Sequence, residues 1–201
     1  MRVIVGCEYS GTVREAFRKL GHDAWSNDLL DADDGSPFHY KGDLLELLAT
    51  ERFDLGIFHV PCTHLAVSGA RHFKAKQEDG RQGEGLNFAF EVMATNLPRW
   101  AVENPVSIIS TQITKSDQTV QPWMFGHKEN KATCLWLHRL PKLVPTNIVG
   151  PMPKDASPEE RKEWNRMHLM PPGPNRWKER SKTYQGLADA MAEQWGCLPN
   201  G

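Results

Sequence analysis

The sequence is poor in cysteine and has no paired cysteines. Four cysteines occur in 201 residues, and none of them forms a Cys-x-x-Cys pair: Cys7, Cys62, Cys134 and Cys197. Thiols this far apart do not indicate a disulfide framework, and they exclude a zinc site built on paired cysteines. Any one of the four thiols is still available as a nucleophile.

The sequence also lacks a long apolar run and an excess of charge of one sign. No run of about 18 apolar residues occurs, so no membrane-spanning helix is expected. The opening residues, MRVIVGCEYS, contain no signal-peptide core followed by a cleavage site, which predicts a cytoplasmic protein. The formal net charge is -1, so a nucleic-acid partner would need a local basic patch.

What the sequence does contain is an alternation of short apolar segments with amphipathic ones. Strands are expected at residues 2–6, 22–27, 53–60, 100–103 and 131–137. Helices are expected at residues 12–20, after Gly42-Asp43 with Asp43 as the N-cap, and at residues 86–97 and 182–195. This order predicts one α/β domain, residues 1–201, built on a mostly parallel, doubly wound sheet. Trp123, Trp136 and Trp195 are expected in its core.

Three segments are expected to lack regular structure. Residues 31–40 are acidic and contain Gly and Pro, and residues 71–85 are polar and suggest a mobile loop. Residues 140–174 are rich in proline, and residues 140–180 are a candidate insertion for contacting a substrate. Basic residues there interleave with Trp164 and Trp177, a pattern that suits phosphate contact and base stacking as well as a charged surface over packed tryptophans.

Chemically capable residues stand where the predicted strands end. CEYSG (7–11) follows the first strand, Asp28 the second, Pro61-Cys62 the third, and Glu103-Asn104 the fourth. Because ligands of doubly wound sheets bind at the carboxyl ends of strands, we expect these residues to share one site. An acidic residue in the position of Asp28 typically binds ribose hydroxyls.

Cys62 and Glu103 together suit one reaction. A thiolate that adds to carbon 6 of cytosine turns the ring into an enamine, and protonation of ring nitrogen 3 by a carboxylic acid eases this addition. Carbon 5 then accepts a methyl group from a sulfonium donor, and loss of its proton frees the cysteine. Structural roles remain open for both residues, although a glutamate completing an apolar strand is costly without a purpose.

At these positions the chain resembles the cytosine-C5 DNA methyltransferase family, in the compact form found in phages and prophages. Pro61-Cys62-Thr63 is similar to its nucleophile motif, Glu103-Asn104-Pro105 to its Glu-Asn motif, and residues 184–195 to its last conserved element. The resemblance implies a Rossmann-like methyltransferase fold that binds S-adenosylmethionine and methylates cytosine in DNA. It implies catalytic roles for Cys62, Glu103 and Asn104. The cofactor-binding residues that it implies are Cys7, Glu8, Ser10, Gly11, Asp28, Asp43 and Pro61.

The chain departs from the family in three respects. Thr63 and Pro105 replace the usual Gln and Val, and the usual arginine pair has only Lys128 and Lys131 in its place. A target-recognition domain of about a hundred residues is missing. We expect the substrate to be contacted by residues of the loop after the nucleophile and by one lysine, namely Thr63, Ser68, Arg71 and Lys131.

Other readings of the same residues remain open. The chemistry could act on RNA or on a free pyrimidine nucleotide, or the chain could be a nucleic-acid-binding relative without activity. An amino-methyltransferase is disfavoured because the Asp/Asn-Pro-Pro-aromatic run is absent. His59, His64 and His72 surround Cys62, but strand alternation spreads their side chains over both faces, so no metal site is expected. His64 is an alternative residue for orienting the thiol or the substrate.

Overall fold

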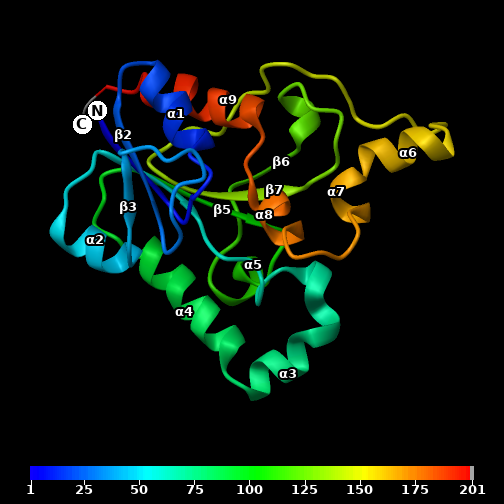
Figure 1. Ribbon diagram of the computed structural model, residues 1–201, viewed down its shortest axis with the longest axis horizontal. Coiled ribbons are helices and arrows are strands. Elements are labelled where there is room, and N and C mark those ends of the chain that lie inside the picture. The colour runs from blue at the N-terminus through cyan, green and yellow to red at the C-terminus, as the bar shows by residue number, and fades with distance from the viewer. Residues whose placement is uncertain (200–201) are drawn as a thin grey trace.

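The computed structural model describes residues 1–199, so the last two positions of the predicted domain lie outside the described residues. Within this range, seven strands form one sheet in the order β3-β2-β1-β4-β5-β7-β6 (Figure 1). The strands are β1 (Arg2–Gly6), β2 (Asp23–Asp28), β3 (His39–Lys41), β4 (Leu55–His59), β5 (Trp100–Pro105), β6 (Gln118–Val120) and β7 (Thr133–His138).

Strand β7 is antiparallel to both of its neighbours, whereas β1 to β5 pair in parallel. Strand β6 therefore runs in the same direction as β5. If β7 is set aside, the order becomes 3-2-1-4-5-6, which is the order of the Rossmann fold. The predicted Rossmann-like, mostly parallel sheet is confirmed.

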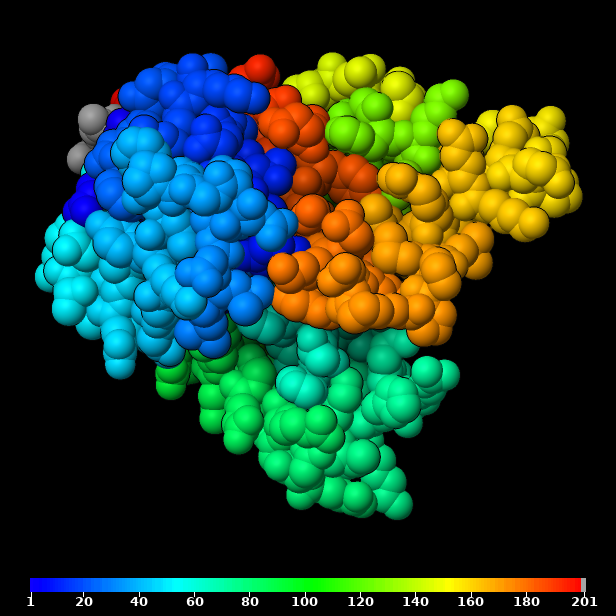
Figure 2. Space-filling model, in the orientation of Figure 1, coloured from blue at the N-terminus to red at the C-terminus, as the bar shows by residue number. Residues whose placement is uncertain are grey.

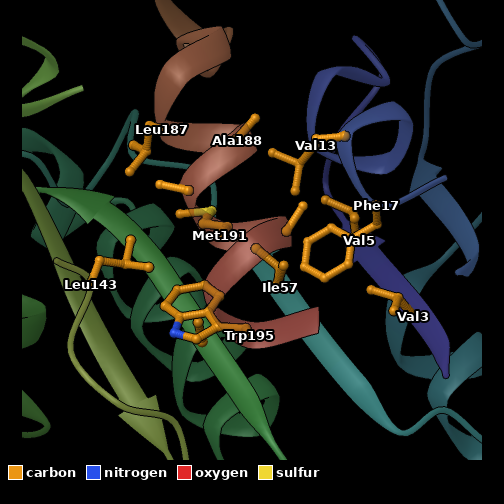
Figure 3. Close-up of a cluster of buried hydrophobic side chains, with 14 of the residues drawn as sticks. Val3, Val5, Val13, Phe17, Ile57, Leu143, Leu187, Ala188, Met191 and Trp195 are labelled. Atoms are coloured by element: carbon orange, nitrogen blue, oxygen red, sulfur yellow. The ribbon is translucent and has the colours of Figure 1, made fainter. Parts of the chain in front are cut away.

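Helices cover both faces of the sheet. Helices α1 (Thr12–Lys19) and α9 (Gln185–Gly196) pack on one face, where Val13, Phe17 and Met191 join one apolar cluster (Figure 3). Helices α2 (Leu44–Thr50), α4 (Arg81–Met93) and α5 (Ile109–Gln112) contribute to a second cluster on the other face. The strand residues alternate between the two clusters, as the period of a strand requires.

The expected core tryptophans divide into two groups. Trp136 and Trp195 are fully buried, as predicted. Trp123 is only half-buried, because it lies in the short 3₁₀ helix η2 (Pro122–Met124), outside both apolar clusters. Among residues 1–199, no helix has the length and apolar content needed to cross a bilayer.

The prediction of a mobile loop at residues 71–85 is wrong. The segment holds the end of the 3₁₀ helix η1 (Val67–His72), then α3 (Phe73–Glu78) and the first residues of α4. Lys, Gln, Glu and Arg dominate here and favour helix, and an exposed helix does not need an apolar stripe. Figure 2 shows residues 67–80, here called the arm, projecting from the body in teal.

The prediction of irregular structure at residues 140–174 is also wrong in part. Helices α6 (Pro158–Trp164) and α7 (Arg166–Leu169) lie within it, and α8 (Arg176–Ser181) follows. Ser157 and Glu160 form a capping box at the start of α6, with Pro158 in the first turn. The expected loop at residues 31–40 ends in β3, a three-residue edge strand too short to show a period.

Candidate active site at the carboxyl edge of the sheet

A cavity of about 290 Å³ opens at the carboxyl ends of β1, β2 and β4. Four residues expected to bind a cofactor line it: Cys7, Asp28, Asp43 and Pro61. Asn27 and Gly42, which precede Asp28 and Asp43 in the sequence, also line it. Three apolar residues complete the wall and were not anticipated, namely Leu29, Leu44 and Phe88. No sequence signal marked Phe88, because it comes from α4, on a different part of the chain.

Local hydrogen bonds fix the two carboxylates of this cavity. The buried Asn27 donates from Nδ2 to the carbonyl oxygens of Tyr40 (3.0 Å) and Gly42 (2.9 Å), which joins the end of β2 to the turn before α2. Asp28 Oδ1 accepts from Leu30 N at 3.0 Å. Asp43 Oδ1 accepts from Leu45 N at 2.8 Å, and so caps α2 as predicted.

These residues fit a cofactor with an adenosyl group. Within residues 1–199, Asp28 and Asp43 each use Oδ1 for the backbone, so Oδ2 of each can accept bonds from ribose hydroxyls or an adenine amine. Leu44 and Phe88 supply the apolar surface on which a nucleoside packs. The cavity lies at the low end of the volumes usual for small-molecule sites, roughly 300–1,000 Å³.

The turn after β1 has a structural role as well as a position beside the cavity. Glu8 is buried, and its carboxylate accepts from Val13 N (2.7 Å) and Arg14 N (3.2 Å), so it caps α1. Ser10 Oγ lies 3.2 Å from Thr12 Oγ1, and Gly11 begins the helix with a φ of 70°. Unlike Cys7, none of the three expected cofactor residues Glu8, Ser10 and Gly11 lines the cavity.

Cys7 and Cys62 both follow strands that end at this edge of the sheet, and their environments differ. Burial, together with the charges of Asp28 and Asp43, raises the pKa of the Cys7 thiol to about 12. Cys62 is exposed and begins a turn in which its carbonyl oxygen accepts from Leu65 N (3.0 Å) and Ala66 N (2.9 Å). The protein around its sulfur and the charge of Glu103 raise the pKa of the Cys62 thiol.

Strand β5 joins Glu103 and Asn104 to the Cys62 turn. Asn104 is fully buried and donates from Nδ2 to the carbonyl oxygen of Val60 at 2.7 Å. Glu103 Oε2 lies 3.5 Å from His59 Nδ1. Burial opposes ionisation of Glu103, but the hydrogen bond and charge of His59, together with Lys131, hold its pKa below the usual range. The resting side chain is therefore a carboxylate and not the carboxylic acid that the expected chemistry needs.

Lys131 places a positive charge near both Cys62 and Glu103. Its Nζ donates to the carbonyl oxygens of Arg180 (2.8 Å) and Lys182 (3.4 Å), which holds it under the segment that connects α8 to α9. Its charge lowers the pKa of both Cys62 and Glu103, although for Cys62 the desolvation of the sulfur by the surrounding protein has the larger effect and raises the pKa. Lys128, the alternative considered for this role, instead lines a separate polar hollow of about 350 Å³.

The expected substrate residues after Cys62 belong to an exposed surface beside it. Thr63 is exposed, and its carbonyl oxygen accepts from Lys76 Nζ of the arm at 2.5 Å. Ser68 and Arg71 lie exposed on η1, where Arg71 Nε donates to His72 Nε2 at 2.9 Å. None of the three lines the cofactor-sized cavity, and all three are exposed, so they are open to a ligand outside it.

Unsatisfied polar atoms collect in the same region. Among the described residues, four buried side-chain atoms lack a hydrogen-bond partner: His59 Nε2, His64 Nδ1, Asn104 Oδ1 and Ser107 Oγ. All four belong to the segments that flank Cys62 and Glu103. Such groups are costly in a folded protein and tend to mark functional sites. Within residues 1–199, no three His, Cys, Asp or Glu side chains are grouped as metal ligands.

Comparison with known proteins adds little to this picture. No family model and no curated protein matches the chain. One solved structure, a candidate DNA modification methyltransferase encoded within an E. coli prophage, superposes with a TM-score of 0.47 at 14% identity. The match covers 68% of this chain and 46% of the other, so the chain spans less than half of that protein. The likeness does not assign a function. The fold and site by themselves define a Rossmann-like protein with a nucleoside-sized cavity beside a thiol and a carboxylate.

Proposed function

We propose that this protein transfers a methyl group from S-adenosylmethionine to carbon 5 of cytosine in DNA through a covalent bond to Cys62. The observation that carries the proposal is the bond from Asn104 Nδ2 to Val60 O, 2.7 Å long. It fixes the strand end bearing Glu103 to the turn bearing Cys62. Pro61, which lies between Val60 and Cys62 in the sequence, lines the cavity that fits an adenosyl group.

The cavity residues hold the donor in this proposal. Asp28 and Asp43 accept hydrogen bonds from its hydroxyl and amine groups, and Leu44 and Phe88 pack against its rings. When bound, S-adenosylmethionine supplies an electrophilic methyl group. Because Pro61 lines the cavity and Cys62 follows it in the chain, the nucleophile is next to the donor site.

Cys62 and Glu103 act on the base. The Cys62 thiol gives its proton to water and its sulfur bonds to carbon 6, while Glu103, protonated in the reacting complex, delivers the proton that ring nitrogen 3 takes up as carbon 5 becomes nucleophilic. After methylation, carbon 5 gives its proton to water, ring nitrogen 3 returns its proton to Glu103, and the bond from sulfur to carbon 6 breaks, which frees the thiolate. The raised pKa of the Cys62 thiol means that it rests mostly protonated at neutral pH, and Lys131 limits this penalty.

DNA is the proposed substrate because basic groups flank the thiol on two sides. The arm carries Arg71 and Lys76, and the segment around α8 carries Lys178 and Arg180. Arg180 is close enough for its charge to lower the pKa of Cys62. Phosphate groups on either side of a target nucleotide would find cations there. RNA and free nucleotides are the alternatives that share this chemistry.

The test is methyl transfer from tritium-labelled S-adenosylmethionine to duplex DNA, single-stranded DNA, RNA and deoxycytidine nucleotides in parallel. We expect label in DNA, recovered as 5-methylcytosine after hydrolysis. Cys62→Ser should abolish transfer, and the matched control Cys197→Ser, at another exposed cysteine, should retain it. Product recovered as N4-methylcytosine, or transfer by Cys62→Ser, would overturn the mechanism. Transfer confined to RNA or nucleotides would overturn the choice of DNA.

A further inference from the structure

His59 occupies a position that the strand pattern would give to an apolar residue. It ends β4, and it follows Leu55 and Ile57 on the face of the sheet that packs under α1 and α9. Figure 3 shows Ile57 within that apolar cluster. The parallel register places His59 directly beside Glu103 of β5. Neighbours in register share a face of the sheet, so the two side chains lie side by side at its carboxyl edge.

The pair is almost sealed from water. Only 9% of the His59 side chain and 14% of the Glu103 side chain are exposed. His59 Nδ1 lies 3.5 Å from Glu103 Oε2, whereas Nε2 is buried and has no hydrogen-bond partner among the described residues. An apolar side chain would fill this place without an unsatisfied nitrogen, so packing alone does not account for the histidine.

Three charged groups face the imidazole. Glu103 approaches from β5, Glu8 from the turn that caps α1, and Lys131 from the segment before β7. Burial favours the neutral ring, but the hydrogen bond and charge of Glu103, with the charge of Glu8, raise the pKa of His59 above its usual value. Lys131 opposes them. The result is a His59 cation beside the Glu103 carboxylate, with Glu8 and Lys131 acting on it in opposite directions.

We propose that His59 is a positioning residue for Glu103, which orients its carboxylate and stores the proton that Glu103 delivers. This inference rests on the proposed function. At rest the proton is on His59 Nδ1 and Glu103 is ionised. As Glu103 gives a proton to ring nitrogen 3 of the cytosine, the His59 proton moves to Glu103. Ring nitrogen 3 returns a proton when the sulfur–carbon bond breaks, and His59 is charged again.

The first test needs no activity. The imidazole ¹⁵N shifts of His59 are followed by NMR against pH in the full chain. We expect His59 to remain charged above pH 6.5, about the unperturbed value for histidine. In Glu103→Gln, the imidazole should lose its charge at a lower pH than in the wild type. A His59 that titrates at or below the ordinary value, unchanged by Glu103→Gln, would overturn the proposal.

The second test compares His59→Asn with the wild type in methyl transfer. Without His59, its hydrogen bond and charge no longer hold down the pKa of Glu103, so burial raises that pKa and Glu103 must carry the proton itself. The ratio of variant to wild-type rate should therefore fall on the order of tenfold per pH unit between that Glu103 pKa and the pKa of His59. Ionisation of Cys62 affects both proteins and cancels in the ratio. A purely structural loss would lower the rate by the same factor at every pH.

His138→Asn is the matched control. His138 is at the far end of β7, in register with Trp100 and stacked on its ring with centroids 5.4 Å apart. Its rate ratio should not depend on pH.

If the wild type transfers no methyl group but the NMR result holds, the proposed function fails and the proton pair survives. If transfer occurs and the His59→Asn ratio is flat with pH, the function survives and this inference fails.

Discussion

Asn104 ties two strand ends together by donating from its side-chain amide to the carbonyl oxygen of Val60, at 2.7 Å. The asparagine is fully buried. Its effect is on the next two residues of that loop, Pro61 and Cys62. This bond joins the end of β5, which carries Glu103, to the end of β4, which leads into Cys62.

Replacing Asn104 by Ala should therefore damage both stability and transfer. The Val60 carbonyl oxygen loses its side-chain donor, which should lower the free energy of unfolding by about 1–3 kcal/mol. Urea denaturation measures that loss, and methyl transfer should fall far more than the fraction unfolded explains. Gln118→Ala is the matched control, because Gln118 bonds to both backbone groups of Leu143 at 2.8 Å. Equal loss of transfer in both variants would refute a specific role for Asn104.

The charge of Lys131 predicts a pH effect with a definite sign. Its ammonium lowers the pKa of the Cys62 thiol. The surrounding protein desolvates the sulfur and raises that pKa by more. In Lys131→Met that pKa should rise further, so the thiolate appears at higher pH than in the wild type. Alkylation of Cys62 by iodoacetamide, followed by peptide mass spectrometry from pH 7 to 10, measures the shift. Lys128→Met should leave the curve in place, and a shift of equal size there would contradict the assignment.

Asp28 should contribute directly to cofactor affinity. Asp28→Ala removes a charged acceptor from the cavity wall, which should weaken binding of S-adenosylmethionine by about 1.5–3 kcal/mol. Isothermal titration calorimetry gives the affinity. Asp31→Ala is the control, because Asp31 is exposed and pairs with Lys41 at 2.9 Å. Unchanged affinity in Asp28→Ala would mean that the ribose partner is elsewhere.

The small size of the region at residues 140–180 bears on the choice of substrate. A base in a duplex must leave its stack before a thiol can reach carbon 6, at a cost of a few kcal/mol. Here only three short helices and Trp177, which is 53% exposed, are available to offset it. We expect transfer to single-stranded DNA to equal or exceed transfer to duplex, with weak sequence selectivity. Activity restricted to one fully paired sequence would contradict this.

The sequence predicted the sheet and the neighbourhood of Cys62 well, for a physical reason. Apolar strands that alternate with helices leave few topologies, and parallel strands bring their ends to one edge. Residues as far apart as Asp28 and Pro61 were therefore expected together, and both line the cavity. The carboxylate of Glu8 caps α1, and in sequence such a carboxylate looks the same as one beside a cofactor turn, so its cofactor role stays a prediction.

Other features depended on information that the sequence holds only weakly. The pairing of His59 with Glu103 depends on the register of two strands 44 positions apart, which no local pattern specifies. The helix α6 did carry a signal, since Ser157-Pro158-Glu159-Glu160 is the pattern of a capping box. The proline content of the region obscured it.

The central claim is that Cys62 bonds covalently to carbon 6 of cytosine, and trapping with 5-fluorocytosine tests it most directly. Fluorine cannot leave carbon 5 as a proton does, so the enzyme should remain attached to DNA that carries this base once the methyl group has been transferred. Peptide mass spectrometry should locate the adduct on Cys62, and omission of S-adenosylmethionine should prevent its stable accumulation. An adduct on Cys7, Cys134 or Cys197, or methyl transfer to cytosine with no adduct on the fluorinated substrate, would contradict the account.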